Sequence, residues 1–444
     1  MVGGGPSGFY AAEALLKADG VEVDMLERLP APYGLVRYGV APDHPKLKLP
    51  ALAYARIAAA PGFRFIGGVS LGRDVDIETL RAAYHAVIVC CGAGSDRPMG
   101  IPGESLAGSR TATEFVGWYN GHPDYAGRSF DLAHECVAIV GHGNVALDVC
   151  RILAKPVDAL RHTDICEHAL QVLSRSKVRD IHLIGRRGPA QARFTDKELR
   201  ELGEIPGVEV RVDSADLELD PVSQAESSAQ GSGAIAWNME ALRDLASRPS
   251  DRGGKRIHLH FLKSPVELIG DGRVGGLRLE KNRLAGPPFG QWAIGTGLTE
   301  VLECGLVFRS VGYKGVPIAG LPFDARLGLI PNREGRVTEG EVPIAGLYCA
   351  GWIKRGPTGI IGTNRADANE TVANVLADLN VQRQLPPREG ADGFLRGLDV
   401  RGVRYLDFEG WLKIDAQEVA RGIAAGKPRE KFVRIDEMLD VAGR

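Results

Sequence analysis

Two glycine-rich segments have the residue types and spacing that bind a dinucleotide. Residues 3–8 fit the pattern G-x-G-x-x-G, and residues 141–146 fit G-x-G-x-x-A. In this pattern the first glycine makes a tight turn, the second lets the backbone approach a pyrophosphate, and the third position lets a helix pack closely on a strand. A run with few helix breakers follows each segment, so we predict helices whose N-termini face phosphate. The glycines of these turns are Gly3, Gly5, Gly8, Gly141 and Gly143.

The residues after the next strand differ between the two segments. The predicted strand 21–26 ends in Glu27, at the position of a ribose-binding carboxylate. The predicted strand 180–184 instead runs into Arg186 and Arg187, and arginine at this position accommodates a 2′-phosphate as a planar fork. The first site is therefore expected to prefer a nucleotide with a free ribose diol, and the second to prefer NADP(H) over NAD(H). The alternative for the arginine pair is a solvated loop.

Three further features carry side chains that could take part in a reaction. Residues 28–45 form a long segment rich in proline and glycine that includes His44, for which both a proton-handling and a structural role are open. Glu198 and Glu201 share one face of the predicted helix 196–202, either as solvated acids or as site residues. Trp352 follows a predicted strand and is suited either to stacking beside a cofactor or to packing in the core.

The elements that must position these residues indicate an α/β protein with two Rossmann-like dinucleotide-binding domains built on parallel sheets. We expect the first domain at residues 1–95 and 315–444, with the second inserted at 96–314. Only Met1 and Val2 precede the first glycine turn, so we expect the natural chain to start upstream; alternatively, the short form binds its nucleotide weakly. Further predictions are strands at 63–66, 69–71, 86–94, 136–140, 257–262, 266–269, 274–279, 305–310 and 347–350, helices at 113–119, 147–153 and 366–379, and a flexible loop at 220–233.

Composition narrows the class of protein. The chain has 444 residues, of which 44% are apolar and 25% charged, as in an ordinary globular protein of two or three domains. A net charge of −2 argues against a general nucleic-acid binder, and the absence of an 18-residue apolar run argues against a membrane span. Seven cysteines without C-x-x-C or zinc spacing indicate a reducing compartment and no metal site. A disulfide reductase needs a redox-active cysteine pair. Cys90 and Cys91 are adjacent and do not form C-x-x-C, which argues against that class of enzyme.

Several longer motifs occur in one order along the chain, at residues 33–45, 115–120, 143–149, 185–189 and 351–359. With these motifs the chain resembles ferredoxin–NADP reductases of the adrenodoxin reductase type, a family that includes a mycobacterial branch. The resemblance runs from Gly3 into residues 426–430. It implies FAD in the first site and NADPH in the second.

The resemblance also implies particular contacts. Those to FAD fall on Ser7, Glu27, Leu35, Leu71, Trp352, Gly359, Ile360 and Ile361. Those to NADP(H) fall on His142, Gly143, Asn144, Val145, Arg186, Arg187, Glu198 and Gly359. His142 varies in the family, so its backbone matters more than its ring. His44 and Glu201 match the histidine and glutamate that are proposed to assist the transfer, and these two residues are the candidate catalytic side chains.

By resemblance, the chain is a monomeric oxidoreductase that passes electrons from NADPH through FAD to a ferredoxin-type iron–sulfur protein. Two alternatives stay open: an NADPH-dependent flavin diaphorase with a quinone or synthase-subunit acceptor, and a nucleotide-binding subunit without turnover. The chain has no iron–sulfur cysteine pattern, so any cluster belongs to a partner. Residues 220–233 lack the basic cluster expected for docking acidic ferredoxins. The implied location is the bacterial cytoplasm, with the mitochondrial matrix left open.

Overall fold

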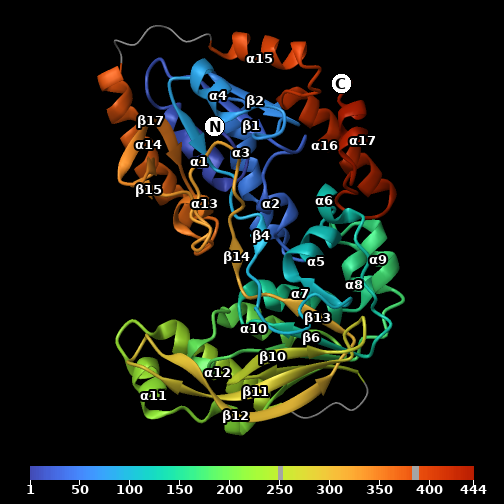
Figure 1. The fold of residues 1–444 in the computed structure, drawn as a ribbon. Coiled ribbons are helices and arrows are strands. Elements are labelled where there is room, and N and C mark those ends of the chain that lie inside the picture. Colours follow the sequence, from blue (N-terminus) through green and yellow to red (C-terminus); the bar gives the residue numbers. More distant parts are fainter. Residues whose placement is uncertain (249–253, 383–389) are drawn as a thin grey trace. The chain divides into compact units, whose positions relative to one another are not determined.

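The computed structural model describes residues 1–248, 254–382 and 390–444, which form two compact units (Figure 1). The first unit comprises Met1–Ser95, Asn120–Pro123 and Gly312–Arg444, and the second comprises Asp96–Tyr119 and Asp124–Val311. The second unit is therefore inserted into the sequence of the first. The domain limits predicted from sequence stay a prediction, because they rest on which nucleotide each domain holds.

The first unit contains a parallel sheet whose centre is formed by the first two residues. Strand β1 (Val23–Glu27) pairs in parallel with β2 (Phe63–Gly67), and β3 (Val87–Val89) pairs in parallel with β17 (Val342–Cys349). Val2 bridges both β1 and β3: its N–H donates to Ile88 O at 2.9 Å, and its carbonyl accepts from Cys90 N at 2.7 Å. The two residues before the glycine turn thus lie where the pattern places a buried strand.

Antiparallel strands and helices complete this unit. β17 pairs antiparallel with β16 (Arg336–Glu339), and β16 pairs antiparallel with β15 (Asn332–Arg333). Its helices are α1 (Pro6–Leu15), α2 (Leu35–Tyr38), α3 (Pro50–Ala58), α4 (Ile77–Ala83), α13 (Trp352–Arg355), α14 (Thr363–Gln382), α15 (Gly390–Val400), α16 (Phe408–Ala424) and α17 (Ile435–Val441), with the 3-10 turn η1 (Pro45–Lys48). The rings of Phe9 and Tyr54 stack at 4.9 Å, and Trp411 packs edge-on against Tyr33 at 5.8 Å. Helix α16, near the carboxyl end of the chain, is therefore part of the same core as helix α1 after the glycine turn.

The second unit is built on a six-stranded parallel sheet. Its strand order is β5 (Ser109–Thr111), β13 (Leu306–Arg309), β6 (Cys136–Val140), β7 (Asp180–Ile184), β9 (Lys255–His260) and β8 (Val208–Val212). The helices of this unit are α5 (Ala112–Tyr119), α7 (Asn144–Ala154), α8 (Val157–Arg161), α9 (Glu167–Leu173), α10 (Asp196–Leu202), α11 (Pro221–Ser228) and α12 (Gly233–Ser247), with the 3-10 turns η2 (Pro189–Gln191) and η3 (Ser214–Leu217). The short strands β4 (Ser95–Asp96) and β14 (Tyr313–Lys314) and helix α6 (Pro123–Ala126) lie where the chain passes from one unit to the other.

The two faces of the six-stranded sheet have different covers. Ile181 and Leu183 of β7 pack into a core shared with α7 and α12, whereas Ile184 packs with Leu277 and Leu279 of a second sheet. That sheet is antiparallel and consists of β10 (Lys263–Ile269), β11 (Gly276–Ala285) and β12 (Trp292–Glu303). Both faces being covered explains why strand β6 is a continuous apolar run. No helix in the described parts of the chain has the length and apolarity needed to cross a bilayer.

Three local predictions were wrong or incomplete. The predicted loop at residues 220–233 is mostly helix α11, because Asp220 caps it by accepting from the N–H groups of Val222 and Ser223 at 3.0 and 3.1 Å. The predicted strand 69–71 is irregular and leads into a turn at residues 72–74, in which Asp74 accepts from Ser70 N at 2.8 Å. Strand β12 was not predicted, because it is exposed along most of its length and shows no alternating pattern.

A buried ion pair joins helix α2 to helix α16. Arg37 Nη2 lies 2.5 Å from Glu418 Oε1, and both side chains are at most 4% exposed. The Arg37 guanidinium lies 4.9 Å from the ring centre of Trp411, and Glu418 also accepts from Phe432 N at 2.9 Å. Because removing one partner leaves a buried charge uncompensated, this pair holds the segment beside the glycine turn firmly in place.

We expect Glu418→Gln to lower the free energy of unfolding by about 3 kcal/mol, since Arg37 would keep its buried charge without a counter-charge. The measurement is urea unfolding followed by tryptophan fluorescence. The control is Asp440→Asn on α17, whose exposed pair with Arg404 is worth less than about 1 kcal/mol. Equal effects of the two variants would contradict the assigned role of the buried pair.

Candidate nucleotide-binding sites

The first glycine turn has the geometry of a phosphate-binding loop. Gly3 has a φ of +111°, and a Cβ there would lie 2.5 Å from Cys90 O. A Cβ on Gly8 would lie 2.1 Å from Gly3 O, so helix α1 approaches the strand end as closely as only glycine permits. Gly5 differs, because a Cβ there would meet no atom within 4 Å. The turn therefore leaves open space beside the backbone at the N-terminus of α1, where a pyrophosphate fits.

The second glycine turn repeats this arrangement in the other unit. Gly141 has a φ of +136°, and a Cβ there would lie 2.2 Å from Ser310 O. A Cβ on Gly143 would again meet no atom within 4 Å, and α7 begins at the next residue, Asn144. Ala146 is fully buried at the third position. Both turns thus fit the phosphate groups of a dinucleotide.

Glu27 lies at the end of β1, beside the first turn. Its Oε2 accepts from Gly4 N at 2.7 Å, and its Oε1 accepts from Leu29 N at 3.1 Å. Burial raises the pKa of this carboxyl, and the backbone hydrogen bonds from Leu29 and Gly4 oppose that shift. Each carboxylate oxygen has two lone pairs, so each keeps an acceptor position that a ribose hydroxyl can occupy.

Ser7 and Trp352 are brought together by the close approach of α1 and the Gly351 turn. Gly351 has a φ of +80°, and a Cβ there would lie 2.1 Å from Ser7 Oγ. Asp367 of α14 accepts from Gly351 N at 2.5 Å. The Trp352 ring stacks on Tyr313 at 5.4 Å, and its buried indole N–H has no hydrogen-bond partner among the described residues. A buried donor without a partner fits a cofactor that supplies the acceptor.

The other residues predicted for the first site lie in the same unit. Leu35 begins α2 and is 43% exposed, next to Gly34, whose Cβ position lies 3.0 Å from Gly5 Cα. Leu71 packs against a separate apolar cluster of this unit. The segment 359–361 precedes α14, with Gly359 at a φ of +82°. Ile360 is 75% exposed and Ile361 packs against the core that contains α1.

The arginine pair follows β7 directly, at the carboxyl edge of the parallel sheet. Arg186 is exposed and Arg187 is half-buried, with Arg187 Nη2 donating to Gln191 O at 3.3 Å. Burial lowers the pKa of Arg187, and so do the nearby positive charges of Arg193 and Arg186. Arg193 was not predicted as a site residue, because it occupies no position of a known nucleotide-binding motif. These cations lie where a 2′-phosphate is expected.

The side chains of His142, Asn144 and Val145 support the second turn from within. Burial lowers the pKa of His142 to about 4, and its ring packs against Phe261 at 4.8 Å, so the imidazole is neutral and belongs to the core. Asn144 Oδ1 accepts from Thr195 N at 2.9 Å, which ties the turn to the start of α10. Val145 packs against the main apolar core of the unit.

Glu198 and Glu201 lie beside a fully buried arginine that sequence reasoning missed. Arg151 of α7 donates from Nη2 to Asp148 Oδ1 at 2.6 Å and from Nη1 to Glu198 Oε2 at 3.2 Å. Its Nη1 also lies 4.0 Å from Glu201 Oε2. Glu198 is buried, whereas the Glu201 side chain is 26% exposed. Arg151 therefore fixes Glu198, whereas Glu201 lies near the same guanidinium and is partly exposed.

His44, the other candidate catalytic side chain, belongs to the first unit. It is half-buried and immediately precedes the turn η1, and its N–H donates to Ala41 O at 3.0 Å. The segment 28–45, predicted to be irregular, contains only the single helical turn α2 before it. The segment lies beside the first glycine turn through Tyr33, whose N–H donates to Gly4 O at 2.7 Å.

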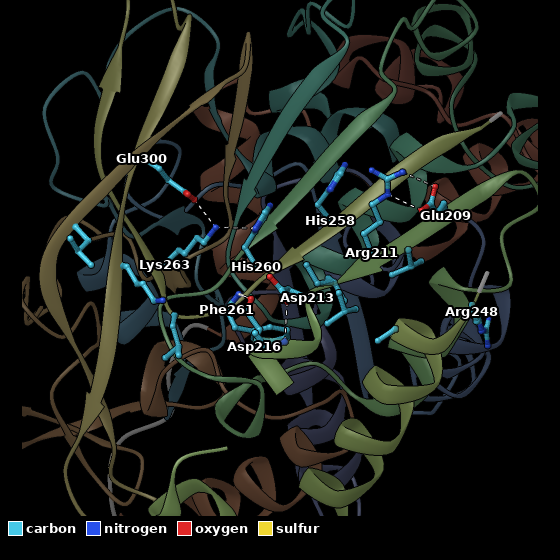
Figure 2. A pocket seen from close by; sticks show the side chains of 18 of the residues that line it. Glu209, Arg211, Asp213, Asp216, Arg248, His258, His260, Phe261, Lys263 and Glu300 are labelled. Carbon is cyan, nitrogen blue, oxygen red and sulfur yellow. Dashed lines mark hydrogen bonds and ion pairs between the residues drawn. The ribbon is translucent and has the colours of Figure 1, made fainter. Parts of the chain in front are cut away.

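A polar pocket of about 840 Å³ that the sequence did not predict lies along β8, β9 and β10 (Figure 2). His182 and His258 stack in parallel at 4.3 Å, and His182 Nδ1 lies 2.9 Å from His260 Nε2. Asp180 Oδ1 lies 2.7 Å from His258 Nε2, and the same carboxylate pairs with Arg256. Asp180, His182 and His258 each place one possible ligand atom within 4.8 Å of the other two, and the Asp180 carboxylate is already engaged by His258 and Arg256.

The comparisons with known proteins agree with this geometry. No protein-family model matches the chain. The chain is 44% identical over 453 residues to "NADPH-ferredoxin reductase FprA" of Mycobacterium tuberculosis strain H37Rv, covering 99% of this chain and 98% of that protein. It is 43% identical over 456 residues to "NADPH:adrenodoxin oxidoreductase, mitochondrial" of Arabidopsis thaliana, covering 100% and 94% respectively.

The comparison with solved structures gives the same result as the comparison of sequences. The solved structure of M. tuberculosis FprA in complex with NADPH matches with a TM-score of 0.94 and 42% identity, covering 100% of this chain and 98% of that one. The predicted fold class, α/β with two dinucleotide-binding domains, is confirmed, and so is the resemblance stated from the motifs. This chain belongs to the family of NADPH–ferredoxin and NADPH:adrenodoxin oxidoreductases.

Proposed function

We propose that this chain is an FAD-dependent oxidoreductase that passes electrons from NADPH to a ferredoxin-type iron–sulfur protein. The observation that carries the proposal is the pair of glycine turns with open second glycines, one beside the Glu27 carboxylate and one beside Arg186 and Arg187. A free ribose diol suits the carboxylate, and a 2′-phosphate suits the arginines. Two different nucleotides can therefore be held by one chain.

FAD is assigned to the first unit. The N-terminus of α1 would hold its pyrophosphate and Glu27 its ribose, while Ser7, Leu35, Leu71, Trp352 and residues 359–361 would surround the rest. The unpartnered indole N–H of Trp352 supports this assignment, because it needs an acceptor. When bound, FAD accepts a hydride and releases electrons one at a time, and the protein supplies orientation and excludes water.

NADPH is assigned to the second unit. The turn at Gly141, Gly143 and Asn144 would hold its pyrophosphate, with His142 and Val145 contributing through their backbone. Arg186 and Arg187 would pair with its 2′-phosphate. Glu198 is proposed as a nucleotide contact, and its pairing with Arg151 supports this by giving α10 a fixed place beside the turn. For transfer itself, we propose that His44 and Glu201 hold or move protons near the reacting rings.

The partner and setting are part of the same proposal. The chain is proposed to act as a monomer on a ferredoxin or a related iron–sulfur protein in a reducing compartment, either the bacterial cytoplasm or the mitochondrial matrix. All seven cysteines are free thiols, which suits such a compartment. The exposed arginines Arg243 and Arg248, on and directly after α12, are the candidates for docking an acidic partner, whereas Lys255 Nζ donates to Leu153 O at 2.5 Å within its own unit.

The proposal is tested by anaerobic titration of the flavin-loaded protein. NADPH is expected to bleach the flavin absorption at a much lower concentration than NADH, and the reduced protein is expected to pass electrons to a ferredoxin faster than to quinones. Faster transfer to quinones would favour the diaphorase alternative. Failure of NADPH to bleach the bound flavin would contradict the proposed function.

The glycine geometry predicts opposite effects of two neighbouring substitutions. Gly5→Ala places a methyl group in open space at a φ of −90°, so we expect unchanged folding but at least about tenfold lower FAD retention, since the methyl group occupies the pyrophosphate position. Gly8→Ala instead collides with Gly3 O and is expected to lower the thermal midpoint. Flavin content after dialysis and thermal unfolding distinguish the two. Full flavin retention in Gly5→Ala would contradict the placement of FAD.

The proposed role of Glu201 can be separated from a structural one. We expect Glu201→Gln to lower kcat at least about tenfold, because it removes a proton-holding group while keeping its shape. KM for NADPH and the thermal midpoint should stay unchanged. Glu204→Gln, an exposed position near the end of the same helix, is the control and should leave kcat unchanged. A kcat like that of the unsubstituted protein in Glu201→Gln would refute the role.

A further inference from the structure

A third arginine lies beside the pair that follows β7. Arg193 is exposed and comes two residues after η2, whose carbonyl at Gln191 accepts the Arg187 guanidinium at 3.3 Å. Among the described residues, neither Arg193 nor the pair Arg186 and Arg187 forms an ion pair with a carboxylate. The three arginines therefore offer positive charge to an anion from outside the protein.

The backbone of Arg193 is fixed against the second glycine turn. Its N–H donates to His142 O at 2.8 Å, and two residues later Thr195 N donates to Asn144 Oδ1 at 2.9 Å. The segment 193–195 thus follows the turn that is proposed to hold the pyrophosphate. The backbone of Arg193 therefore lies next to the second glycine turn, and its side chain extends from that place.

The charge of Arg193 acts on Arg187. Besides the burial of Arg187, the positive charges of Arg193 and then Arg186 lower the pKa of the Arg187 guanidinium. Like charges held this close cost free energy in the empty protein, because each guanidinium repels its neighbours. The binding of a dianion removes that cost, and a phosphate monoester carries a charge of about −1.5 to −2 at pH 7.

We propose that Arg193 is a third cation for the 2′-phosphate of NADPH and increases the preference for NADPH over NADH. This inference rests on the proposed function, which places NADPH at this turn. The pyrophosphate is the other anion within the same nucleotide, but the N-terminus of α7 already offers it backbone N–H groups. The position of Arg193 beside Arg187 favours the monoester.

The test is calorimetric binding of 2′,5′-ADP and of 5′-ADP to the full chain. We expect Arg193→Ala to weaken 2′,5′-ADP about tenfold and to leave 5′-ADP unchanged, because the loss of one charge-assisted hydrogen bond acts only on the 2′-phosphate. Arg193→Lys should restore part of the affinity. Arg175→Ala is the control: it removes an exposed arginine that has no ion-pair partner in the described parts of the chain and that precedes β7, at the opposite end of the strand from Arg186.

Each result decides one question. Unchanged 2′,5′-ADP binding in Arg193→Ala would overturn the inference, and equal weakening of both nucleotides would overturn it in favour of a contact with the 5′-phosphate that both nucleotides carry. Arg187→Ala serves as the reference for the site itself. If Arg187→Ala weakens 2′,5′-ADP and Arg193→Ala does not, only the third cation is refuted. If neither variant weakens it, the proposed NADPH site fails as well.

Discussion

The structure depends on how closely a helix start can approach a strand end. At each glycine turn, backbone carbonyls lie so near the first position that any side chain would collide, and in the first turn the same holds at the third position. Only the second glycine faces open space in both turns. This arrangement directs the N–H groups of α1 and α7 toward an anion, and every other proposed contact is arranged around those two helix starts.

Buried ion pairs then hold the surrounding segments in place. In the first unit, Glu418 of α16 pairs with Arg37. A part of the sequence far from the first turn therefore fixes the segment beside that turn. In the second unit, Arg151 fixes Glu198 and lies close to Glu201. Thr195 and Glu198 have the spacing of a capping box, yet the Glu198 carboxylate goes to Arg151, and Asn144 accepts from Thr195 N instead. Tertiary pairing has overridden a local preference.

The errors in the sequence analysis have physical causes of the same kind. Residues 220–233 are small and polar, which is typical of loops, but one aspartate cap and packing against neighbouring segments were enough to make α11. Strand β12 was missed because a strand exposed on both faces has no hydrophobic period to detect. The buried Arg151 and the exposed Arg193 could not be singled out, because their importance comes from neighbours that are distant in sequence.

The sequence by itself determined the two glycine turns, the acid after one strand, the arginines after the other, and the family, because these features depend on local backbone geometry and on residues a fixed distance along one β-α-β unit. Only the tertiary structure decided which glycine faces a ligand, which acids are held by a buried guanidinium, and which third cation joins the arginine pair. Those properties depend on packing and on charge at short range in space, and spacing along the chain does not encode either.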